Sequence, residues 1–476
     1  MATMIIEGEQ VQAASGETYE VLNPSTGEVV DRVPAGGSED VDRAARAAAK
    51  AFLTWGRLAP AERARILHTA AAHAHSKVAE IAPILTAEQG KTLLESKIEA
   101  ERFADNIAWF ADLADKIHGE HVSLASTKLF GLVVRRPIGV TGAIIPWNFP
   151  LTLAANKVAP AIAAGNCVVL KPASSTPLAT LACIQALIDG GLPEGVINVV
   201  LGSGTNEAIV EHPLIRKIAL TGSTPTGKHV MRKAADRLKK LTLELGGSDP
   251  CIVMEDADID AAAVGVRVGR YFNCGQACLA TKRIYVHEAV YDEFVEKIVA
   301  QAKKMKPGDG TRPDSRMGPM HSANQRAEVE AQLQDAVDRG ARIVYGGGRP
   351  EGDEYARGHF INASVVLDVA PGSRMLTEEV FGPALPIVKI KDLDEGLRLA
   401  NDSPFGLGSS IWTRDMGKAF RAINEIEAGY TWVNSVQIAY DELPFGGTKE
   451  SGFGKEHGIE AFHQYTEQKS VVIGGL

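Results

Sequence analysis

The sequence predicts an α/β protein in which parallel strands alternate with helices in two successive domains. Its 476 residues are too many for one hydrophobic core, which indicates two or three domains. From Gly139 onward, short apolar runs alternate with helical runs, the pattern of a parallel sheet covered by helices. The hydrophobic content of 45% and charged content of 23% are those of an ordinary globular chain.

Three kinds of segment precede this alternation. Residues 5–34 have the pattern of short strands separated by glycine turns. Residues 41–118 carry Ala-rich amphipathic runs, which predict helices. Residues 123–140 resemble exposed strands flanked by charges, a segment suited to pairing with another subunit.

The alternating region divides near residue 246. Before that point we expect strands at 139–145, 166–170, 196–201, 217–220 and 241–245, with helices at 151–164, 177–189 and 225–238. After it we expect strands at 251–254, 284–287, 343–345, 385–390 and 430–434, with helices near 257–273, 290–305, 321–339 and 414–425. The last residues, about 466–476, return to strand character.

Charge and cysteine content exclude several classes of protein. The net charge of −9, from 50 basic and 59 acidic residues, argues against nucleic acid or an anionic membrane as a main partner. No stretch has the apolar length of a membrane span, and the N-terminus lacks the features of a signal peptide. Five sparse cysteines favour reduced thiols. We therefore expect a soluble cytoplasmic protein without a nucleic-acid or membrane partner.

Cys278 and Glu244 are candidates for covalent chemistry at a carbonyl. Cysteine is the most nucleophilic side chain near neutral pH when its surroundings favour the thiolate. A glutamate followed closely by two glycines, Gly246 and Gly247, can move, and desolvation raises its pKa towards that of a general base. Either residue alone is explained as well by a buried thiol or by an acid at a strand end. The pair gains meaning only from the rest of the chain.

Eight short motifs occur in an order and spacing that resemble the aldehyde dehydrogenase superfamily over essentially the whole chain. They are Pro146–Pro150, Lys171–Ser174, Thr221–Gly227, Glu244–Gly247, Gly275–Cys278, Glu379–Pro383, Trp432–Asn434 and Pro444–Gly447. The resemblance implies a Rossmann-type parallel-sheet cofactor domain over residues 1–118 and 138–246 and a second α/β catalytic domain over 247–450. It also implies a small β oligomerisation element over 119–137 and 451–476, in a homodimer or homotetramer.

The resemblance implies oxidation of an aldehyde to a carboxylic acid. Cys278 would form a thiohemiacetal and then a thioester, while the Asn148 amide and the backbone N–H of Cys278 stabilise the oxyanion. Glu244 would activate the water that releases the acid, which argues against a relative that transfers the acyl group to coenzyme A. Reuse of the scaffold as a binding protein is a third reading, disfavoured by the intact set of Cys278, Glu244, Asn148 and Lys171.

The cofactor implied by the resemblance is NAD or NADP. Its expected contacts are Ile145, Pro146, Trp147, Lys171, Ser174, Gly204, Gly222, Ser223, Gly227, Leu245, Glu379 and Phe381. The turn at Gly222–Gly227 follows a strand and opens a helix, where free N–H groups suit a pyrophosphate. Ser174 stands where many NAD-preferring relatives carry a glutamate, which predicts competence with both cofactors. Ser174 or Thr176 also suits capping of the helix that follows.

The expected substrate pocket is mostly apolar. Its candidate residues are Phe149, Thr152, Leu153, Asn156, Ala277, Leu279, Ala439, Phe445 and Arg102. Thr152 and Leu153 are explained as well by helix packing, and Arg102 by a solvated helix face. Asn156 and Phe272 occupy positions where succinate-semialdehyde dehydrogenases usually carry two arginines, which puts a dicarboxylic semialdehyde in doubt.

Two other readings concern metals and proton relay. Cys274 and Cys278 lack the paired spacing and the histidines of a zinc site, so we expect no metal. Glu456 matches a position that the family associates with proton relay to the base, and a solvated surface glutamate explains it equally well.

Overall fold

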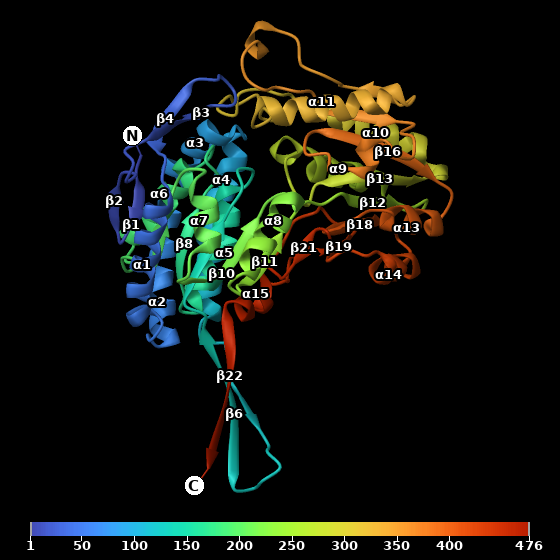
Figure 1. The fold of residues 1–476 in the computed structure, drawn as a ribbon. Coiled ribbons are helices and arrows are strands. Elements are labelled where there is room, and N and C mark those ends of the chain that lie inside the picture. The colour runs from blue at the N-terminus through green and yellow to red at the C-terminus, as the bar shows by residue number, and fades with distance from the viewer. Residues whose placement is uncertain (1, 475–476) are drawn as a thin grey trace.

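In the computed structural model, which describes residues 2–474, two α/β units lie side by side and a long β arm projects from the first (Figure 1). The first unit contains an eight-stranded sheet of order β2-β1-β9-β8-β7-β10-β11-β21. Its parallel centre is built from β9 (Ile197–Val199), β8 (Cys167–Lys171), β7 (Val140–Ile144), β10 (Ile215–Thr221) and β11 (Lys240–Glu244). Antiparallel strands β1 (Met4–Ile6), β2 (Glu9–Val11) and β21 (Gly452–Phe453) complete its edges.

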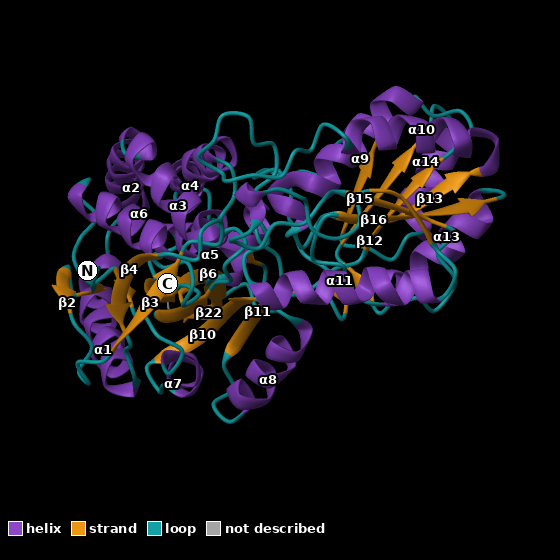
Figure 2. Ribbon diagram, turned by 90° about the horizontal axis from the view of Figure 1, so that it is seen from above, coloured by secondary structure: helices purple, strands orange, loops and turns teal. Residues whose placement is uncertain are grey.

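Helices cover both faces of this sheet (Figure 2). One face carries α2 (Pro60–Ser76), α3 (Val78–Gln89), α4 (Leu93–Leu113), α5 (Pro150–Ala163) and α6 (Leu178–Asp189). The other carries α1 (Ser38–Trp55), α7 (Thr205–Glu211) and α8 (Thr224–Ala235). The hairpin of β3 (Thr18–Leu22) and β4 (Val29–Pro34) lies beside α3, and α15 (Gly458–Gln464) packs on α5.

Buried glutamates fix the start of two of these helices. The carboxylate of Glu88, at the end of α3, accepts the N–H groups of Leu178 (2.7 Å) and Ala179 (2.9 Å) at the start of α6. Glu99 of α4 accepts the N–H of Leu151 at 2.8 Å, in the first turn of α5. A carboxylate at a helix N-terminus satisfies free N–H groups and complements the helix dipole.

The second unit is a seven-stranded sheet of order β14-β15-β16-β13-β12-β18-β19. Its strands are β12 (Asp249–Val253), β13 (Thr281–His287), β14 (Arg342–Tyr345), β15 (Ser364–Leu367), β16 (Ala384–Ile390), β18 (Gly408–Trp412) and β19 (Tyr430–Val433). Its α-helices are α9 (Ile259–Tyr271), α10 (Tyr291–Ala302), α11 (Ala323–Asp338), α12 (Arg374–Thr377), α13 (Leu393–Asn401) and α14 (Met416–Glu425). A small ladder joins β17 (Phe405–Gly406) to β20 (Thr448–Lys449).

The arm is a three-stranded antiparallel sheet of order β22-β6-β5. The long strands β6 (Leu129–Pro137) and β22 (Thr466–Gly474) pair along their whole length, and β5 (Glu120–Val122) adds to β6. The two segments that we expected to seek partners in another subunit therefore pair with each other within one chain. The outer edges of β22 and β5 remain open in the monomer.

The structure differs from our expectations at several elements. It adds α7, α13, β15 and β18, which the sequence pattern did not predict. Residues 452–465, which we assigned to the oligomerisation element, pack on the first unit: β21 joins its sheet, and Phe462 is buried in its core. Among the described residues, no helix is both long and apolar enough to cross a membrane.

Candidate active site

Cys278 lies at the end of a strained loop between α9 and β13. The 3-10 turn η1 (Phe272–Gly275) contains three successive residues with positive φ: Asn273 at 50°, Cys274 at 56° and Gly275 at 71°. Non-glycine residues rarely adopt this conformation, and such strain is often found at functional sites. The Gly275 position also admits no side chain, because a Cβ there would overlap the carbonyl of Gly382. The loop leaves Cys278 partly exposed, whereas Cys274 is buried.

Glu244 is the last residue of β11, and the turn that follows it contacts Cys278. A Cβ built on Gly247 would lie 2.9 Å from the carbonyl oxygen of Cys278, so these two loops are in contact. The Glu244 side chain is 3% exposed, and neither of its carboxyl oxygens has a hydrogen-bond partner. Gly446 leaves room for this carboxyl, because a Cβ at that position would lie 2.5 Å from Glu244 Oε1. A buried carboxyl without partners has an unmet capacity to bind a proton or water.

Burial changes the proton affinity of both groups. Desolvation raises the pKa of Glu244 well above its ordinary value, Glu456 raises it further, and Lys157 opposes the shift. Desolvation likewise raises the pKa of the Cys278 thiol to about 12, and the positive charge of Lys282 is the main opposing influence. In the free protein the Cys278 thiol therefore holds its proton at neutral pH, and Glu244 has the raised proton affinity of a general base.

Asn148 lies against the loop that carries Cys278. Its side-chain Nδ2 donates to the carbonyl of Gln276 at 3.0 Å, two residues before Cys278. Its own carbonyl accepts hydrogen bonds from Lys91 Nζ and Asn273 Nδ2, both at 2.8 Å. The backbone N–H of Asn273 in turn donates to Glu95 Oε1 at 2.7 Å. Asn148 is therefore held from both sides, as an amide that stabilises a developing oxyanion must be.

Lys282 is a site residue that sequence reasoning missed. Its buried ammonium donates to the carbonyl of Cys278 at 2.5 Å and to Glu379 Oε1 at 3.0 Å. Glu379 Oε1 also accepts the N–H of Gly247 at 3.0 Å. A lysine four residues after the nucleophile could have been noticed, because it opens a buried strand, where an unpaired charge is costly.

The expected cofactor residues gather at the carboxyl ends of parallel strands. Trp147 follows β7, and its ring stacks on His321 (centroids 4.5 Å apart) and meets Phe381 edge-on (5.7 Å). Ser174, after β8, and Gly204 line one cavity of about 730 Å³. Gly222, Ser223 and Gly227 open α8, Ile145 and Pro146 extend β7, and Leu245 packs on Gly227. This edge is where ligands bind in doubly wound sheets.

Lys171 provides the strongest test of whether these residues fit a nucleotide. It is the last residue of β8 and is 5% exposed, and no side chain of the described residues pairs with its ammonium. Desolvation lowers its pKa to about 8. A buried cation without a partner is unstable unless an anion or hydroxyl joins it, so the site fits a sugar or a phosphate.

The expected substrate residues fall into two groups. Leu279, Ala439 and Phe445 share one hydrophobic cluster with Cys278, beside Leu407 and Trp432. Phe149, Thr152 and Leu153 lie at the start of α5, Asn156 lies in the middle of this helix, and Ala277 is buried in the loop that carries Cys278. Phe149 stacks on Phe272 with centroids 6.0 Å apart, whereas Leu153 also belongs to the core of the first unit.

The contacts of Arg102 and Glu456 bear on two readings that the sequence left open. Arg102 is not a freely solvated helix residue: it donates to the carbonyl of Ala439 at 3.3 Å and to Asp441 Oδ1 at 3.2 Å. Glu456 is not a surface residue, since it is 3% exposed and pairs with Lys157. Its second oxygen accepts from Asn156 Nδ2 at 2.9 Å. Asn156 is therefore bound to Glu456.

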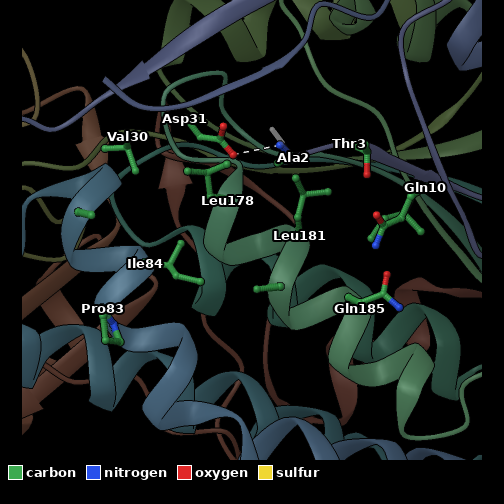
Figure 3. A pocket seen from close by; sticks show the side chains of 13 residues that line it. Ala2, Thr3, Gln10, Val30, Asp31, Pro83, Ile84, Leu178, Leu181 and Gln185 are labelled. Carbon is green, nitrogen blue, oxygen red and sulfur yellow. Dashed lines mark hydrogen bonds between the residues drawn. The ribbon is translucent and has the colours of Figure 1, made fainter. Parts of the chain in front are cut away.

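Two further features lie outside this arrangement. Across residues 2–474 no cluster of His, Cys, Asp and Glu side chains has the composition of a metal site. A separate, largely apolar cavity of about 590 Å³ lies between the N-terminal strands, α3 and α6 (Figure 3). None of the expected catalytic, cofactor or substrate residues lines it.

Comparison with known proteins gives consistent matches along the chain. The profile of the aldehyde dehydrogenase family matches residues 11–471. The 3-sulfolactaldehyde dehydrogenase of Pseudomonas putida is 40% identical over 473 residues, covering 99% of this chain and 96% of the relative. The NADP(+) succinate-semialdehyde dehydrogenase of Escherichia coli (strain K12) is 38% identical over 472 residues, covering 99% of this chain and 97% of the relative.

A solved structure extends the likeness to the fold. The betaine aldehyde dehydrogenase of Staphylococcus aureus, in complex with NAD+, superposes with a TM-score of 0.96 at 34% identity. The match covers 99% of this chain and 94% of that one. The arrangement of both sheets and the arm is therefore shared with this structure.

Proposed function

The chain belongs to the aldehyde dehydrogenase family, and on this basis we propose that it oxidises an aldehyde to a free carboxylic acid through a Cys278 thioester. It is an NAD(P)+-dependent oxidoreductase whose substrate is a small-molecule aldehyde. The cofactor is NAD or NADP. The proposal concerns the residues that perform the reaction.

Cys278 is the proposed nucleophile. Its sulfur attacks the aldehyde carbon to form a thiohemiacetal, and the positive charge of Lys282 favours the thiolate. The oxygen that becomes negative is met by the Asn148 amide and by the backbone N–H of Cys278, which has no partner among the described residues. Each such donor typically contributes about 3 kcal/mol to the transition state.

Lys171 and Glu379 are the proposed nucleotide clamps: Lys171 would hold a ribose or a phosphate, and Glu379 would hold the ribose on the nicotinamide side. NAD(P)+, when bound, accepts a hydride from the carbon attached to sulfur, which leaves a thioester on Cys278. Lys171 supplies an unpaired ammonium, and Glu379 supplies a carboxylate held by Lys282 and Gly247. Ser174 would place no negative charge beside the adenosine ribose, where NADP carries its additional phosphate. The proposal therefore includes use of both NAD and NADP.

Glu244 is the proposed base for hydrolysis. Its carboxyl has no hydrogen-bond partner and a raised pKa, so it can take a proton from water as that water attacks the thioester. Glu456 and Lys157 lie behind it as a buried ion pair. The orphaned Glu244 carboxyl beside the Cys278 loop is the observation that carries the proposal, and it favours water over coenzyme A as acyl acceptor.

The test is substitution of Cys278 by alanine. We expect Cys278→Ala to lose NAD(P)H formation with every aldehyde tried, because no acyl-enzyme can form, while NADP still binds in a fluorescence titration. Wild-type product analysis should give the free acid whether or not coenzyme A is present. Turnover by the alanine variant, or an acid yield that requires coenzyme A, would overturn the proposed mechanism.

Assembly and location follow from other features. The open edges of the arm, β22 and β5, suit pairing with a second copy, so we propose a homodimer or a homotetramer built from two dimers. Light scattering should give one of these masses, and a monomer would contradict the proposal. All five cysteines are free thiols in the structure, in keeping with the proposed cytoplasmic location.

A further inference from the structure

The loop that follows β19 reaches from the second α/β unit to the first, beside the proposed nucleophile. We call residues 434–446 the pocket loop. Two of its residues, Ala439 and Phe445, belong to the same hydrophobic cluster as Cys278. The position of the pocket loop therefore decides how closely these two apolar side chains approach the reacting centre.

The first part of the pocket loop is fastened to the second unit. Trp432 Nε1 donates to the carbonyl of Ile438 at 2.9 Å. Gln437 is buried, its Oε1 accepts from Thr281 Oγ1, and its Nε2 lies 3.4 Å from Asp249 Oδ2. These contacts fix where the loop leaves the sheet of the second unit.

The contacts with the first unit meet at Asp441. Its Oδ1 accepts from Arg102 Nη2 at 3.2 Å and from Asn106 Nδ2 at 3.1 Å, and both residues lie on α4. His457 Nδ1 lies 2.8 Å from the same oxygen, without the alignment of a hydrogen bond. The carbonyl of Asp441 accepts the N–H of Gly458, the first residue of α15, at 2.9 Å. One loop residue thus joins the second unit to two helices of the first.

The carboxylate of Asp441 is charged and largely shielded from solvent. Its side chain is 18% exposed, and that of His457 is 2% exposed. Burial by itself would raise the pKa of Asp441, but His457, Arg102 and Asn106 lower it below its ordinary value, so the group is ionised at neutral pH. Hydrogen bonds to a shielded carboxylate are stronger than those of an exposed ion pair.

The backbone at His457 is strained in a way that serves these contacts. Its φ of 57° lies in the left-handed region, which residues other than glycine rarely adopt. The preceding residue, Glu456, exchanges backbone hydrogen bonds of 2.6 and 2.7 Å with Phe445. The His457 ring meets the Phe445 ring edge-on, with centroids 6.3 Å apart. The strained residue therefore contacts both Asp441 and one of the apolar residues near Cys278.

We propose that Asp441 is a positioning residue that holds the pocket loop against α4 and α15 and thereby sets the width of the substrate pocket. It acts through Ala439 and Phe445 rather than on the aldehyde. Arg102 acts through the same carboxylate and through the carbonyl of Ala439, to which it donates at 3.3 Å. The inference rests on the proposed dehydrogenase function and adds the residue that sets selectivity for aldehyde size.

The kinetic test compares a small aldehyde with a bulky one. In Asp441→Ala the KM for propanal should rise about tenfold, because the released loop no longer packs on a small substrate. The KM for phenylacetaldehyde should rise less, since a wider pocket still contacts the larger side chain. Both kcat and the KM for NADP should stay within about twofold of the wild type, because none of the expected cofactor residues lies in the pocket loop.

Two further variants separate positioning from a general loss of stability. Asp441→Asn keeps an oxygen that accepts from Arg102 and Asn106, so it should recover part of the lost affinity for propanal. It is also the milder variant, should Asp441→Ala fail to fold. Glu442→Ala is the matched control, because it removes a carboxylate from the adjacent, exposed position of the same loop and should leave both aldehydes unaffected.

A double-mutant cycle tests whether Arg102 and Asp441 act through one contact. Arg102→Met should by itself raise the KM for propanal about as much as Asp441→Ala does. The double variant should then be only about tenfold worse than the wild type, rather than about a hundredfold, because the second substitution removes a contact that is already lost. Additive effects would contradict the proposed contact.

Alkylation of Cys278 measures the pocket loop without any turnover. The other four cysteines are buried, so the rate of reaction with iodoacetamide reports on Cys278. Asp441→Ala should speed this reaction at least about threefold, and Glu442→Ala should not. Equal increases in KM for the two aldehydes, or an unchanged alkylation rate, would overturn the role of Asp441 and leave the dehydrogenase intact. Failure of the wild type to oxidise any aldehyde, with faster alkylation of Asp441→Ala, would overturn the dehydrogenase and leave the loop contact intact.

Discussion

Glu244 is held in an environment that is unfavourable for its ionised form, and this is what makes it useful. A carboxylate with no hydrogen bond in a buried site is destabilised relative to the acid, so its proton affinity rises. Nearby Lys157 opposes the rise in the pKa of Glu244. A raised proton affinity is the property that a group needs to take a proton from water.

The first prediction separates acylation from deacylation. In Glu244→Gln the amide cannot take a proton from water, so the thioester should accumulate. We expect one equivalent of NAD(P)H per active site in a rapid burst, followed by turnover slowed at least about a hundredfold. Stopped-flow absorbance gives the burst, and intact-protein mass spectrometry should detect the acylated enzyme. Turnover at the wild-type rate would remove Glu244 from the role of base.

Lys282 acts through its neighbours rather than on the substrate, so we treat it as a positioning residue. Its ammonium joins the carbonyl of Cys278 to the carboxylate of Glu379, which lies on the proposed cofactor side. It is also the main influence that opposes the raised pKa of Cys278. One side chain therefore couples the proposed nucleophile to the proposed nucleotide clamp.

The second prediction tests that coupling. Lys282→Met should raise the pKa of Cys278 further, so alkylation by iodoacetamide at pH 8 should slow about tenfold. The KM for NADP should rise in the same variant because Glu379 loses its anchor. Lys282→Arg should restore much of both properties. Loss of thermal stability with an unchanged alkylation rate and KM would show that Lys282 is only structural.

At the scale of elements, the proposed oxyanion residue Asn148 is positioned by a helix that it does not belong to. Glu99 of α4 accepts the first N–H groups of α5 and pairs with Lys91, which in turn donates to the carbonyl of Asn148. Lys91 precedes α4, and both charges are almost fully buried. The pair therefore fixes the distance between α4, α5 and the Asn148 loop.

The third prediction concerns this buried pair. Lys91→Met leaves the Glu99 charge without its partner, which should cost about 3 kcal/mol of stability. The double variant Lys91→Met/Glu99→Gln should recover part of that loss, because a neutral amide can be buried more cheaply. Urea denaturation measures the stability of both variants. In each variant kcat should fall through misplacement of Asn148, and a loss of stability without any loss of kcat would contradict this role.

Sequence reasoning was reliable where motifs and long periodic runs coincide. The strands that end at Lys171 and Glu244 were placed within about one residue, because apolar runs are bounded there by polar side chains. β18 was missed because Gly408–Trp412 is short and rich in serine, although its residues are fully covered by neighbouring elements. Its burial comes from tertiary packing, which local propensity does not record.

Parts of the site were also beyond sequence reasoning. Lys282 occupies a position where a long cation is usually a surface residue, and only the fold shows that it is buried. The pairing of β6 with β22 joins segments more than 300 residues apart, so no local pattern predicts it. Long-range pairs of this kind require knowledge of the topology.

At the scale of the whole molecule, His321 connects the two α/β units. It precedes α11 in the second unit, and its Nδ1 lies 3.2 Å from the carbonyl of Gln89 and its Nε2 2.7 Å from Ser175 Oγ, both in the first. Nδ1 must donate to the Gln89 carbonyl, which leaves a neutral Nε2 to accept from Ser175. Trp147 stacks on the ring.

The last prediction follows from the titration of this residue. Burial lowers the pKa of His321 from 6.5 to about 4, so below pH 6.5 the unfolded chain takes up a proton that the folded protein does not. Stability from this group is complete above pH 6.5 and is lost as the pH falls towards 4, which amounts to ~2 kcal/mol between pH 7.5 and pH 5.

Urea midpoints at pH 7.5 and pH 5 measure the effect. The urea midpoint of the wild type should be lower at pH 5 than at pH 7.5. This decrease should be smaller in His321→Gln, because glutamine cannot titrate but keeps a donor and an acceptor. The exposed His75 supplies the matched control, since His75→Gln removes a histidine outside the junction between the units. If His321→Gln and His75→Gln lost stability to acid equally, the junction would not be held by a neutral imidazole.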